Sequence, residues 1–153
     1  RKITAGLARI AAGEQDVLEL GNLNAKRDWG FAGDYVDGMW RMLRQETAGD
    51  YVLATGRTHS IRDFAQMAGQ AAGIEFAWEG EGVEERGIDR QTGATRIRVN
   101  PAFYRPAEVE LLVGDASRAR VTLAWAPSVS LEQLAEMMVR ADRDRIARGV
   151  PLQ

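Results

Sequence analysis

The chain has 153 residues, of which 45% are apolar and 27% charged, a balance typical of a folded soluble domain. Its 20 basic and 22 acidic residues give a formal charge of -2, without the strong basic excess of a general nucleic-acid binder. The chain has no cysteine and a single histidine, and no apolar run approaches the roughly 20 residues of a membrane span. We therefore expect a cytoplasmic protein with no metal site and with neither nucleic acid nor membrane as its partner.

The first residues lack an initiator methionine and a signal-peptide core, so we expect the chain to begin within a longer protein. Residues 3–12 have the apolar spacing of a helix, and Gly13 follows where a C-terminal cap is expected. The residues predicted on its buried face are Ile3, Leu7, Ile10 and Ala11. Residues 17–20 then predict a short strand, and residues 21–32 a loop.

A second helix is predicted over residues 34–45, with Asp34 near its start. Its apolar residues recur at the i, i+3, i+4 and i+7 positions that share one helix face, namely Val36, Met39, Trp40 and Leu43. We interpret the stripe of Met39, Trp40 and Met42, and likewise the pair Met137 and Met138, as core and not as a cofactor site. Residues 51–54 follow as an apolar strand.

A third helix is predicted to begin after Ser60, with Asp63 in position to complete a capping box, and to stop at Gly73. The residues predicted to face inward are Ile61, Phe64, Ala65, Ala68 and Ala72. Near the end of the chain, Asp115 precedes a short helix that reaches Leu123. A last helix starts from the capping box of Ser130 and Gln133. Its predicted buried face consists of Leu131, Leu134, Ala135, Met138 and Ala141.

Between these helices the predicted elements are short. Residues 76–78 favour a strand, and residues 95–99 alternate as a half-buried strand. Residues 79–94 are rich in Glu, Gly and Arg, which indicates an exposed, mobile loop or hairpin tip. Residues 103–108 form a second polar-aromatic loop around Pro106.

This order of elements predicts an α/β fold. The chain begins like the last strands and helices of a Rossmann-like sheet and ends as a small α+β region, and this combination matches the second half of a doubly wound enzyme. We treat residues 1–153 as one C-terminal portion. Such a portion by itself would leave strand edges at 17–20 and 51–54 unpaired.

Arg27 is the strongest candidate for ligand binding. It follows Lys26 in a loop after a strand, and its planar guanidinium suits a phosphate bidentately. The alternative is a structural arginine that pairs with Asp28 or Asp34 and fixes the loop, and the pattern by itself favours this alternative.

Arg105 is a second candidate, flanked by the aromatic Tyr104 and the anionic Glu108. Arg105 suits a phosphate and Glu108 suits sugar hydroxyls or a base edge, but an internal Arg105–Glu108 pair that stiffens the turn is equally compatible. Lys2 lies beside Arg1 at a helix start, where an anion is favoured, although a solvated chain end explains the pair as well.

Two catalytic signatures are missing from the sequence. None of the three tyrosines is followed four residues later by a lysine, so the acid–base pair of short-chain dehydrogenases is absent. A glycine-rich dinucleotide turn after a first strand is absent too. His59 has no partner at nucleophile or ligand spacing, and we interpret it as structural. We expect that this chain does not bind a dinucleotide by itself.

Several strings carry a family resemblance. The more specific ones are Ala25-Lys26-Arg27-Asp28-Trp29-Gly30 and Tyr104-Arg105-Pro106-Ala107-Glu108-Val109. The others are residues 1–4, the rest of the run 18–40 with Leu20-Gly21-Asn22, residues 51–64 and the run from Gly114-Asp115 to Leu123-Ala124-Trp125-Ala126-Pro127. Together they resemble the C-terminal half of the GDP-mannose 4,6-dehydratases, which are extended short-chain dehydrogenase/reductases, and only residues 79–98 are uninformative.

The resemblance implies an NADP-dependent lyase of GDP-fucose biosynthesis. A hydride leaves C4 of GDP-mannose, a base takes the C5 proton, water leaves from C6, and the hydride returns to C6, which gives GDP-4-keto-6-deoxymannose. The family's catalytic residues and dinucleotide-binding turn lie upstream of Arg1, so no catalytic residue is assigned, and the chain alone is expected to be inactive. The family also implies a homo-oligomer whose other contacts lie in the missing N-terminal half.

For this half, the resemblance implies that the chain holds GDP-mannose. The implied contacts are Arg27 and Arg105 to the diphosphate, Glu108 to the ribose or base, Gly21 and Asn22 to the nucleotide, and Lys2 as a further cation. Two alternatives stay open, a catalytically dead stand-alone nucleotide-sugar-binding module and a related enzyme such as a GDP-4-keto-6-deoxymannose reductase.

Overall fold

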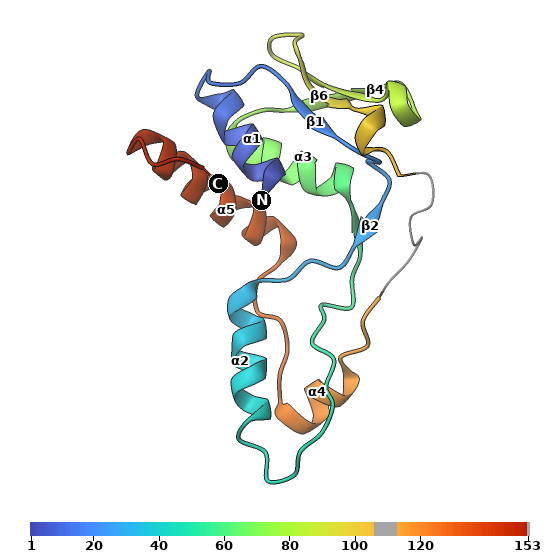
Figure 1. Ribbon diagram of the computed structural model, residues 1–153, viewed down its shortest axis with the longest axis vertical. Helices are drawn as coiled ribbons and strands as arrows, with labels where there is room; N and C mark the ends of the chain where they lie inside the picture. The colour runs from blue at the N-terminus through green and yellow to red at the C-terminus, as the bar shows by residue number, and fades with distance from the viewer. Residues whose placement is uncertain (106–112, 153) are drawn as a thin grey trace.

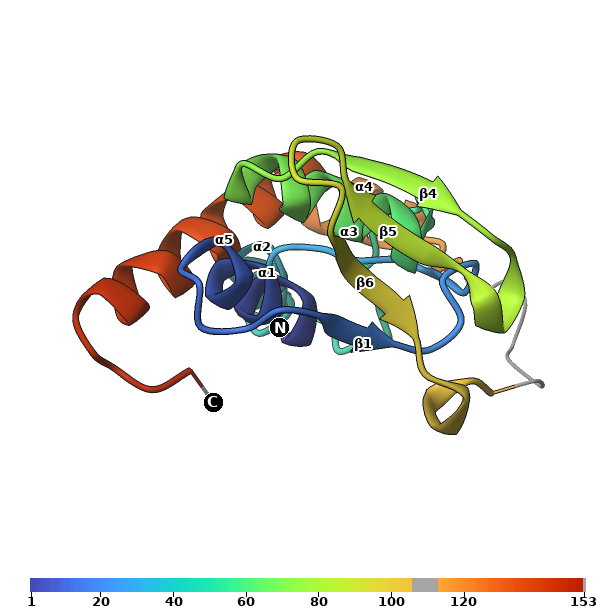
Figure 2. The ribbon, with the colours of Figure 1, turned by 90° about the horizontal axis from the view of Figure 1, so that it is seen from above.

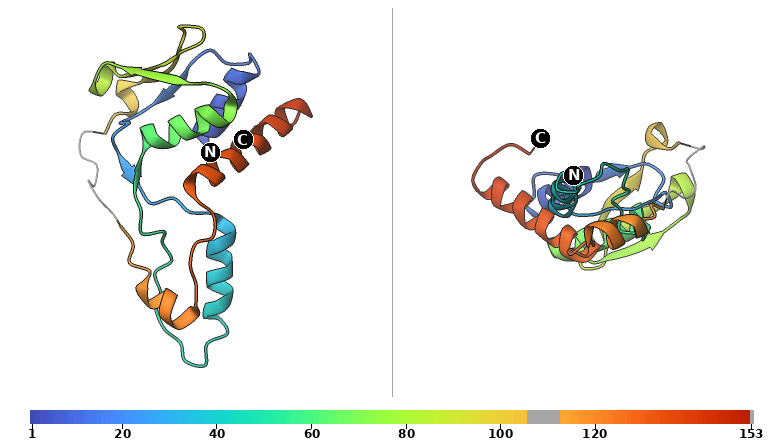
Figure 3. Two further views of the ribbon diagram at one scale, coloured as in Figure 1. Left: turned by 180° about the vertical axis from the view of Figure 1, so that it is seen from behind. Right: turned by 90° about the horizontal axis from the view of Figure 1, so that it is seen from below.

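The computed structural model describes residues 1–105 and 113–152. The described residues form a large lobe with a sheet and three α-helices, and a narrower lobe with two α-helices (Figure 1). Extended segments run between the lobes, as the view from behind also shows (Figure 3). Among the described residues, no helix combines the length and the apolar character that crossing a bilayer requires.

The large lobe is organised around a mixed sheet in the order β1-β6-β5-β4. Its strands are β1 (Leu18–Leu20), β4 (Phe76–Glu79), β5 (Arg86–Asp89) and β6 (Thr95–Val99). β1 pairs with β6 in parallel, with Leu18 in register with Ile97, and the other neighbours are antiparallel. Three helices pack with this sheet around one core (Figure 2), namely α1 (Lys2–Ala11), α3 (Ile61–Ala72) and α5 (Leu131–Ala147).

The small lobe consists of α2 (Ala32–Met42), α4 (Ser117–Leu123) and the extended chain that joins α2 to the large lobe. Its core is small, with Ala116, Ala119, Leu123 and Trp125 as the buried residues. Between the lobes, β2 (Lys26–Arg27) and β3 (His59–Ser60) pair as a two-stranded antiparallel sheet. Two short 3-10 helices, η1 (Gly82–Glu84) and η2 (Pro101–Phe103), complete the elements of the described residues.

The predicted α/β class and all the predicted helices are confirmed. Ser60 Oγ accepts the Asp63 amide at 3.0 Å, and Ser130 Oγ accepts the Gln133 amide at 3.2 Å, so both capping boxes form. α3 ends at Gly73, whose φ of 83° lies in the left-handed region that glycine adopts without strain.

The prediction of an exposed loop or hairpin tip over residues 79–94 was wrong in part, because β5 within this range is an inner strand of the sheet. Some of the charged side chains around β5 are buried and paired within the protein instead of being hydrated. The buried Glu85 lies 2.5 Å from the Arg62 guanidinium, and Asp89 accepts a hydrogen bond from Thr92 Oγ1 at 2.7 Å. Composition could not distinguish these satisfied charges from a hydrated loop.

Several helix-face assignments were also wrong. Ala11 and Ala141 are exposed, and the carboxylate of Asp142 is buried on the inward face of α5 next to α1. On α2, Met39 and Trp40 of the stripe that we interpreted as core face outward, and Met137 on α5 is exposed as well. Met42 and Met138 are partly buried against the two cores.

Residues 51–54 do not form a strand, in contrast to the prediction. Ala54 is buried beside Gly114, and Leu53 packs on the small core, but no backbone ladder with another described residue is present. We predicted that the strand at residues 17–20 would be left unpaired. This prediction was wrong on one side of the strand, where β1 pairs with β6. A strand needs a partner, and local sequence does not supply one.

Candidate functional site

A cavity of about 420 Å³ opens between the start of α1, the loop after β1 and the segment around η2. Its lining includes five of the six residues predicted to bind a ligand, which are Lys2, Gly21, Asn22, Arg27 and Arg105. The sixth, Glu108, lies outside the described residues. Three segments far apart in the sequence therefore meet at one cavity, which we call the basic pocket.

The first turn of α1 places Arg1 and Lys2 at the pocket. The Lys2 ammonium lies 4.2 Å from the centroid of the Phe103 ring, a cation–π distance. The Arg1 guanidinium lies 2.9 Å from the buried Asp142 carboxylate, which also accepts a 2.9 Å hydrogen bond from Thr4 Oγ1. Asp142 of α5 thus fixes the turn that carries both cations.

Gly21 and Asn22 shape the floor of the basic pocket. A Cβ atom at Gly21 would lie 2.4 Å from the Phe103 carbonyl oxygen, so only glycine allows η2 to approach this closely. Asn22 Oδ1 accepts the Asn24 amide at 2.9 Å, which turns the chain toward β2. Their conformational roles are thus clear from the structure.

Arg27 lies on β2, in register with His59, and its Nη1 donates to the Lys26 carbonyl at 2.7 Å. Asp28 and Asp34, the two carboxylates considered as structural partners of Arg27, accept hydrogen bonds from residues of other segments. Asp28 accepts from the Thr55 hydroxyl at 2.5 Å and from the Gly56 amide at 2.9 Å. These bonds tie the strand that carries Arg27 to the returning chain at residues 55–56.

Asp34 is the second of these carboxylates. It accepts the Ser128 hydroxyl at 2.6 Å and the Ser128 amide at 2.9 Å, and a weaker bond of 3.3 Å comes from the Val129 amide. Burial opposes ionisation of this side chain, but the hydrogen bonds from Ser128 and Val129 outweigh it and hold the pKa of Asp34 below its ordinary value. Asp34 therefore joins α2 to the segment that leads into α5.

Aromatic side chains also line the basic pocket, although none of them was among the residues predicted to bind a ligand. Trp29 and Phe64 both line the basic pocket, with ring centroids 5.1 Å apart, and Phe103 lines it next to Lys2. Phe64 gave no ligand signal, because an aromatic residue on the inward face of a helix usually belongs to a core. Trp29 within the Lys26–Gly30 string was the one available hint.

The charged side chains that line the basic pocket are all positive among the described residues. Its described lining residues include four cations, Arg1, Lys2, Arg27 and Arg105, and no carboxylate. Guanidinium and ammonium groups next to aromatic faces can hold an anionic group at one end of a ligand and a flat ring at the other. The arrangement therefore suits a phosphorylated ligand that carries a base.

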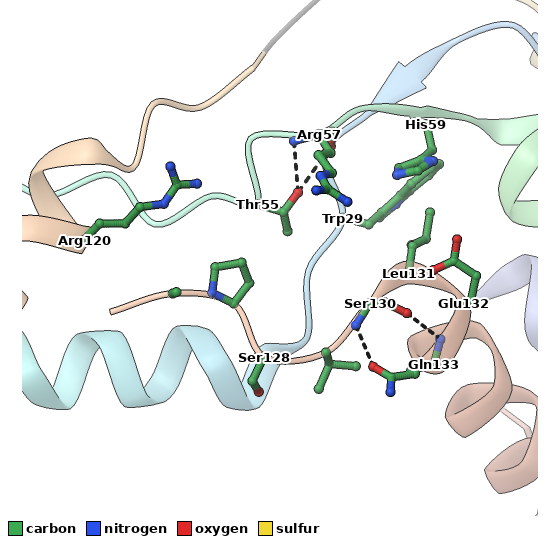
Figure 4. A pocket seen from close by; sticks show the side chains of 13 residues that line it. Trp29, Thr55, Arg57, His59, Arg120, Ser128, Ser130, Leu131, Glu132 and Gln133 are labelled. Carbon is green, nitrogen blue, oxygen red and sulfur yellow. Dashed lines mark hydrogen bonds between the residues drawn. The ribbon is translucent and has the colours of Figure 1, made fainter. Parts of the chain in front are cut away.

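A second hollow of about 430 Å³ lies between the lobes (Figure 4). Arg57, His59 and Arg120 line it, together with Glu132 at the start of α5. The pKa of Glu132 is lowered, first by its own backbone amide and by Ser130, then by the charges of His59 and Arg57. None of the predicted ligand residues lines this hollow, so we take the basic pocket as the candidate site. Among the described residues, no cluster of three or more His, Cys, Asp and Glu side chains is placed to hold a metal.

The comparison with protein families gives a match over residues 1–138 to the family described as GDP-mannose 4,6 dehydratase. A GDP-mannose 4,6-dehydratase of Sinorhizobium fredii is 53% identical over 142 residues, which is 93% of this chain and 40% of the relative. The corresponding proteins of Drosophila melanogaster and Homo sapiens are 49% and 42% identical, with 36% and 38% of their length covered. The chain thus spans about two fifths of these relatives.

Solved structures show the same fold at lower identity. RMD from Pseudomonas aeruginosa, complexed with NADPH, superposes with a TM-score of 0.74 at 21% identity, over 94% of this chain and 41% of that one. A UDP-glucose 4-epimerase from Thermotoga maritima, solved with UDP-glucose, gives 0.67 at 19% identity over 94% and 40%. The matched portion is again about two fifths of each of these chains.

Proposed function

Since the chain belongs to the GDP-mannose 4,6-dehydratase family, we propose that it supplies the GDP-sugar-binding part of such an enzyme. The whole enzyme is a lyase that converts GDP-mannose to GDP-4-keto-6-deoxymannose and water with internal hydride transfer through NADP. The observation that carries the proposal is the basic pocket, where four cations from three separate segments meet beside aromatic faces.

The diphosphate of GDP-mannose is the group that Arg27 and Arg105 suit best. Two guanidiniums match its two negative charges and donate along defined directions, whereas a lysine offers only a point charge. Arg1 and Lys2 add positive potential at the start of α1, and the helix dipole has the same sign there. A doubly charged diphosphate would replace the repulsion among these cations with attraction.

The nucleoside and sugar ends would use the remaining lining. Aromatic faces at Trp29 and Phe103 offer flat apolar surface for a purine ring, and the buried Phe64 supports Trp29 from behind. Gly21 and Asn22 allow the nucleotide to approach the backbone closely, and Glu108 is proposed as an acceptor for ribose hydroxyls or the base. In this proposal the chain binds and orients the substrate.

The residues of this chain do not fit an NADP site. The sequence contains neither a glycine-rich dinucleotide turn nor a Tyr-x-x-x-Lys pair, and the described lining of the basic pocket includes no tyrosine–lysine pair that could serve instead. We therefore assign the cofactor and the chemical step to the portion of the enzyme beyond this chain, and propose that the chain alone is inactive. From the family we further propose a homo-oligomeric, cytoplasmic enzyme of GDP-fucose biosynthesis.

Calorimetric titration with GDP-mannose, GDP and UDP-glucose tests the proposal. We expect saturable binding of GDP-mannose and GDP, and at least tenfold weaker binding of UDP-glucose. A folded chain that binds UDP-glucose as tightly as GDP-mannose would contradict the assignment. The same titration is repeated on the chain joined to the portion of the enzyme that it lacks. Equal affinity in the two forms would mean that these residues complete the pocket, and binding only in the joined form would mean that the pocket needs the rest of the enzyme.

A further inference from the structure

Strands β1 and β6 run in parallel and leave the sheet at the same edge (Figure 2). Leu20 is in register with Val99, so Gly21 and Asn100 follow the two strands side by side. Gly21 lines the basic pocket, and Asn100 is the N-cap of η2, which carries Phe103 to the pocket wall. The junction between the two strand ends therefore decides where η2 lies.

Asn100 lies at this junction and uses each of its four polar groups there. Its backbone amide donates to the Leu20 carbonyl at 2.8 Å, and its carbonyl accepts the Phe103 amide at 2.9 Å. Its side-chain oxygen accepts the Ala102 amide at 2.9 Å, and its side-chain amide donates to Glu19 Oε2 at 2.9 Å. One residue thus joins the end of β1 to η2 through both its backbone and its side chain.

Glu19 is held from a second side. It lies on β1 between two buried leucines, so its side chain projects from the sheet face opposite the core. There its Oε1 accepts the Arg98 guanidinium, with Arg98 Nε at 2.8 Å, and its Oε2 is left for Asn100. The hydrogen bond from Asn100 and then that from Arg98 hold the pKa of Glu19 below its ordinary value, and the charge of Lys2 adds to them. Glu19 is therefore an ionised acceptor for Asn100 at neutral pH.

The polar contacts of η2 matter because the segment has little packing of its own. All three of its residues are exposed, and Phe103 is 49% exposed, so apolar burial does little to fix its position. The hydrogen bonds of Asn100 and the close approach of Gly21 to the Phe103 carbonyl hold it instead. Phe103 meets the Lys2 ammonium at the pocket, and Arg105 follows two residues later. A shift of η2 would move an aromatic face and a guanidinium of the pocket together.

We propose that Asn100 is a positioning residue of the basic pocket, and that its hydrogen bond to Glu19 holds Phe103 and Arg105 where they bind a nucleotide sugar. The proposal rests on the proposed function, since that function gives the pocket its ligand. Asn100 is not among the described lining residues, so it acts through η2. A residue that only capped η2 would need its side-chain oxygen and not the amide that faces Glu19.

Three variants separate the link to Glu19 from the cap of η2. Asn100→Asp keeps the capping oxygen but sets a second carboxylate against Glu19. Asn100→Ser also keeps a capping oxygen, adds no charge and is too short to reach Glu19. The double variant Glu19→Gln with Asn100→Asp exchanges donor and acceptor, so the hydrogen bond forms again at the net charge of the wild type. Asn24→Asp, at an exposed side chain between β1 and β2, is the control for an added negative charge.

Calorimetric titration with GDP-mannose at neutral pH measures the effect on binding. We expect Asn100→Asp and Asn100→Ser each to raise Kd by about fivefold or more, the loss of one hydrogen bond. The double variant should bind within about twofold of the wild type, and so should Asn24→Asp, whose charge is solvated and screened. Wild-type affinity in Asn100→Ser, or a double variant as weak as Asn100→Asp, would overturn the proposal.

Amide hydrogen exchange at Ala102 and Phe103, measured by NMR without ligand, is a second measurement that does not depend on the proposed function. We expect both amides to exchange roughly fivefold faster in each single variant of Asn100 and at the wild-type rate in the double variant, with the amides of α3 unchanged. Unchanged exchange in the single variants would overturn the proposal. A wild-type chain that shows this exchange pattern but does not bind GDP-mannose would contradict only the proposed function, because Asn100 would still position η2.

Discussion

The Asp142 carboxylate lies 2.9 Å from the Arg1 guanidinium, so the last helix of the chain holds its first residue in place at the basic pocket. The same carboxylate accepts a hydrogen bond from the fully buried Thr4 hydroxyl, and Asp142 itself is only 1% exposed. A site built from the start of the chain thus depends on a charge near its end.

Replacing Asp142 should destabilise the fold. In Asp142→Ala the buried Thr4 hydroxyl loses its acceptor and Arg1 loses its partner, which we expect to lower the free energy of unfolding by about 1.5–3 kcal/mol. Urea unfolding measures the effect, and Asp144→Asn, on the exposed side of the same helix, is the control. A loss below about 0.5 kcal/mol, the usual range for surface changes, would mean that Asp142 does not anchor α1.

Removing either pocket arginine should weaken the binding of GDP-mannose. Arg27→Ala and Arg105→Ala each delete a charge-assisted phosphate contact, which costs about 1.5–3 kcal/mol, or roughly 10- to 150-fold in Kd. Arg143→Ala removes an exposed cation from α5 and should leave Kd unchanged. Wild-type affinity in either pocket variant, by calorimetry, would remove that residue from the proposed site.

Gly21 should not tolerate a side chain. The Cβ of Gly21→Ala would lie 2.4 Å from the Phe103 carbonyl oxygen, a backbone atom that cannot rotate away. We expect η2 to shift, with a loss of about 1–3 kcal/mol in stability and weaker nucleotide binding. Asn24→Ala changes an exposed side chain in the same loop and serves as the control. Thermal unfolding and titration that match the wild type would show that the close approach is not required.

Asp34 should contribute to the acid sensitivity of the fold. Its pKa in the folded state lies below the ordinary value of 3.8, so its contribution is present above pH 3.8 and is lost as the pH falls through the folded pKa. Asp34→Asn should therefore lower stability at pH 7 by about 1–3 kcal/mol and lose less on acidification. Unfolding free energies of both proteins from pH 7 to pH 2 test this, and parallel curves would contradict it.

The helices of the large lobe could be predicted because their signals are local. Ser60 with Asp63, Ser130 with Gln133 and the left-handed Gly73 each act within one turn of their own helix. The candidate ligands Arg27 and Arg105 were also identified from their own strings, since a basic loop beside aromatic residues is a local pattern.

Other features could not be predicted because they depend on distant partners. The apolar period of α2 predicted a helix correctly, but its buried side was set by Gly38 and Asp34 against Leu53 and Ser128. Residues 86–89 became an inner strand because β4 and β6 flank them. The segment 51–54 has strand composition and no strand partner among the described residues.

The sequence by itself determined the α/β class, the start and end of α3, the start of α5, the family resemblance and the absence of a dinucleotide signature, because each depends on residues close together in the chain. Only the tertiary structure decided that Lys2, Arg27 and Arg105 share one pocket, that Asp142 anchors the first turn, and that the apolar face of α2 points outward. These are contacts between segments tens of residues apart, and their geometry is fixed by packing and by buried hydrogen bonds, which no local pattern encodes.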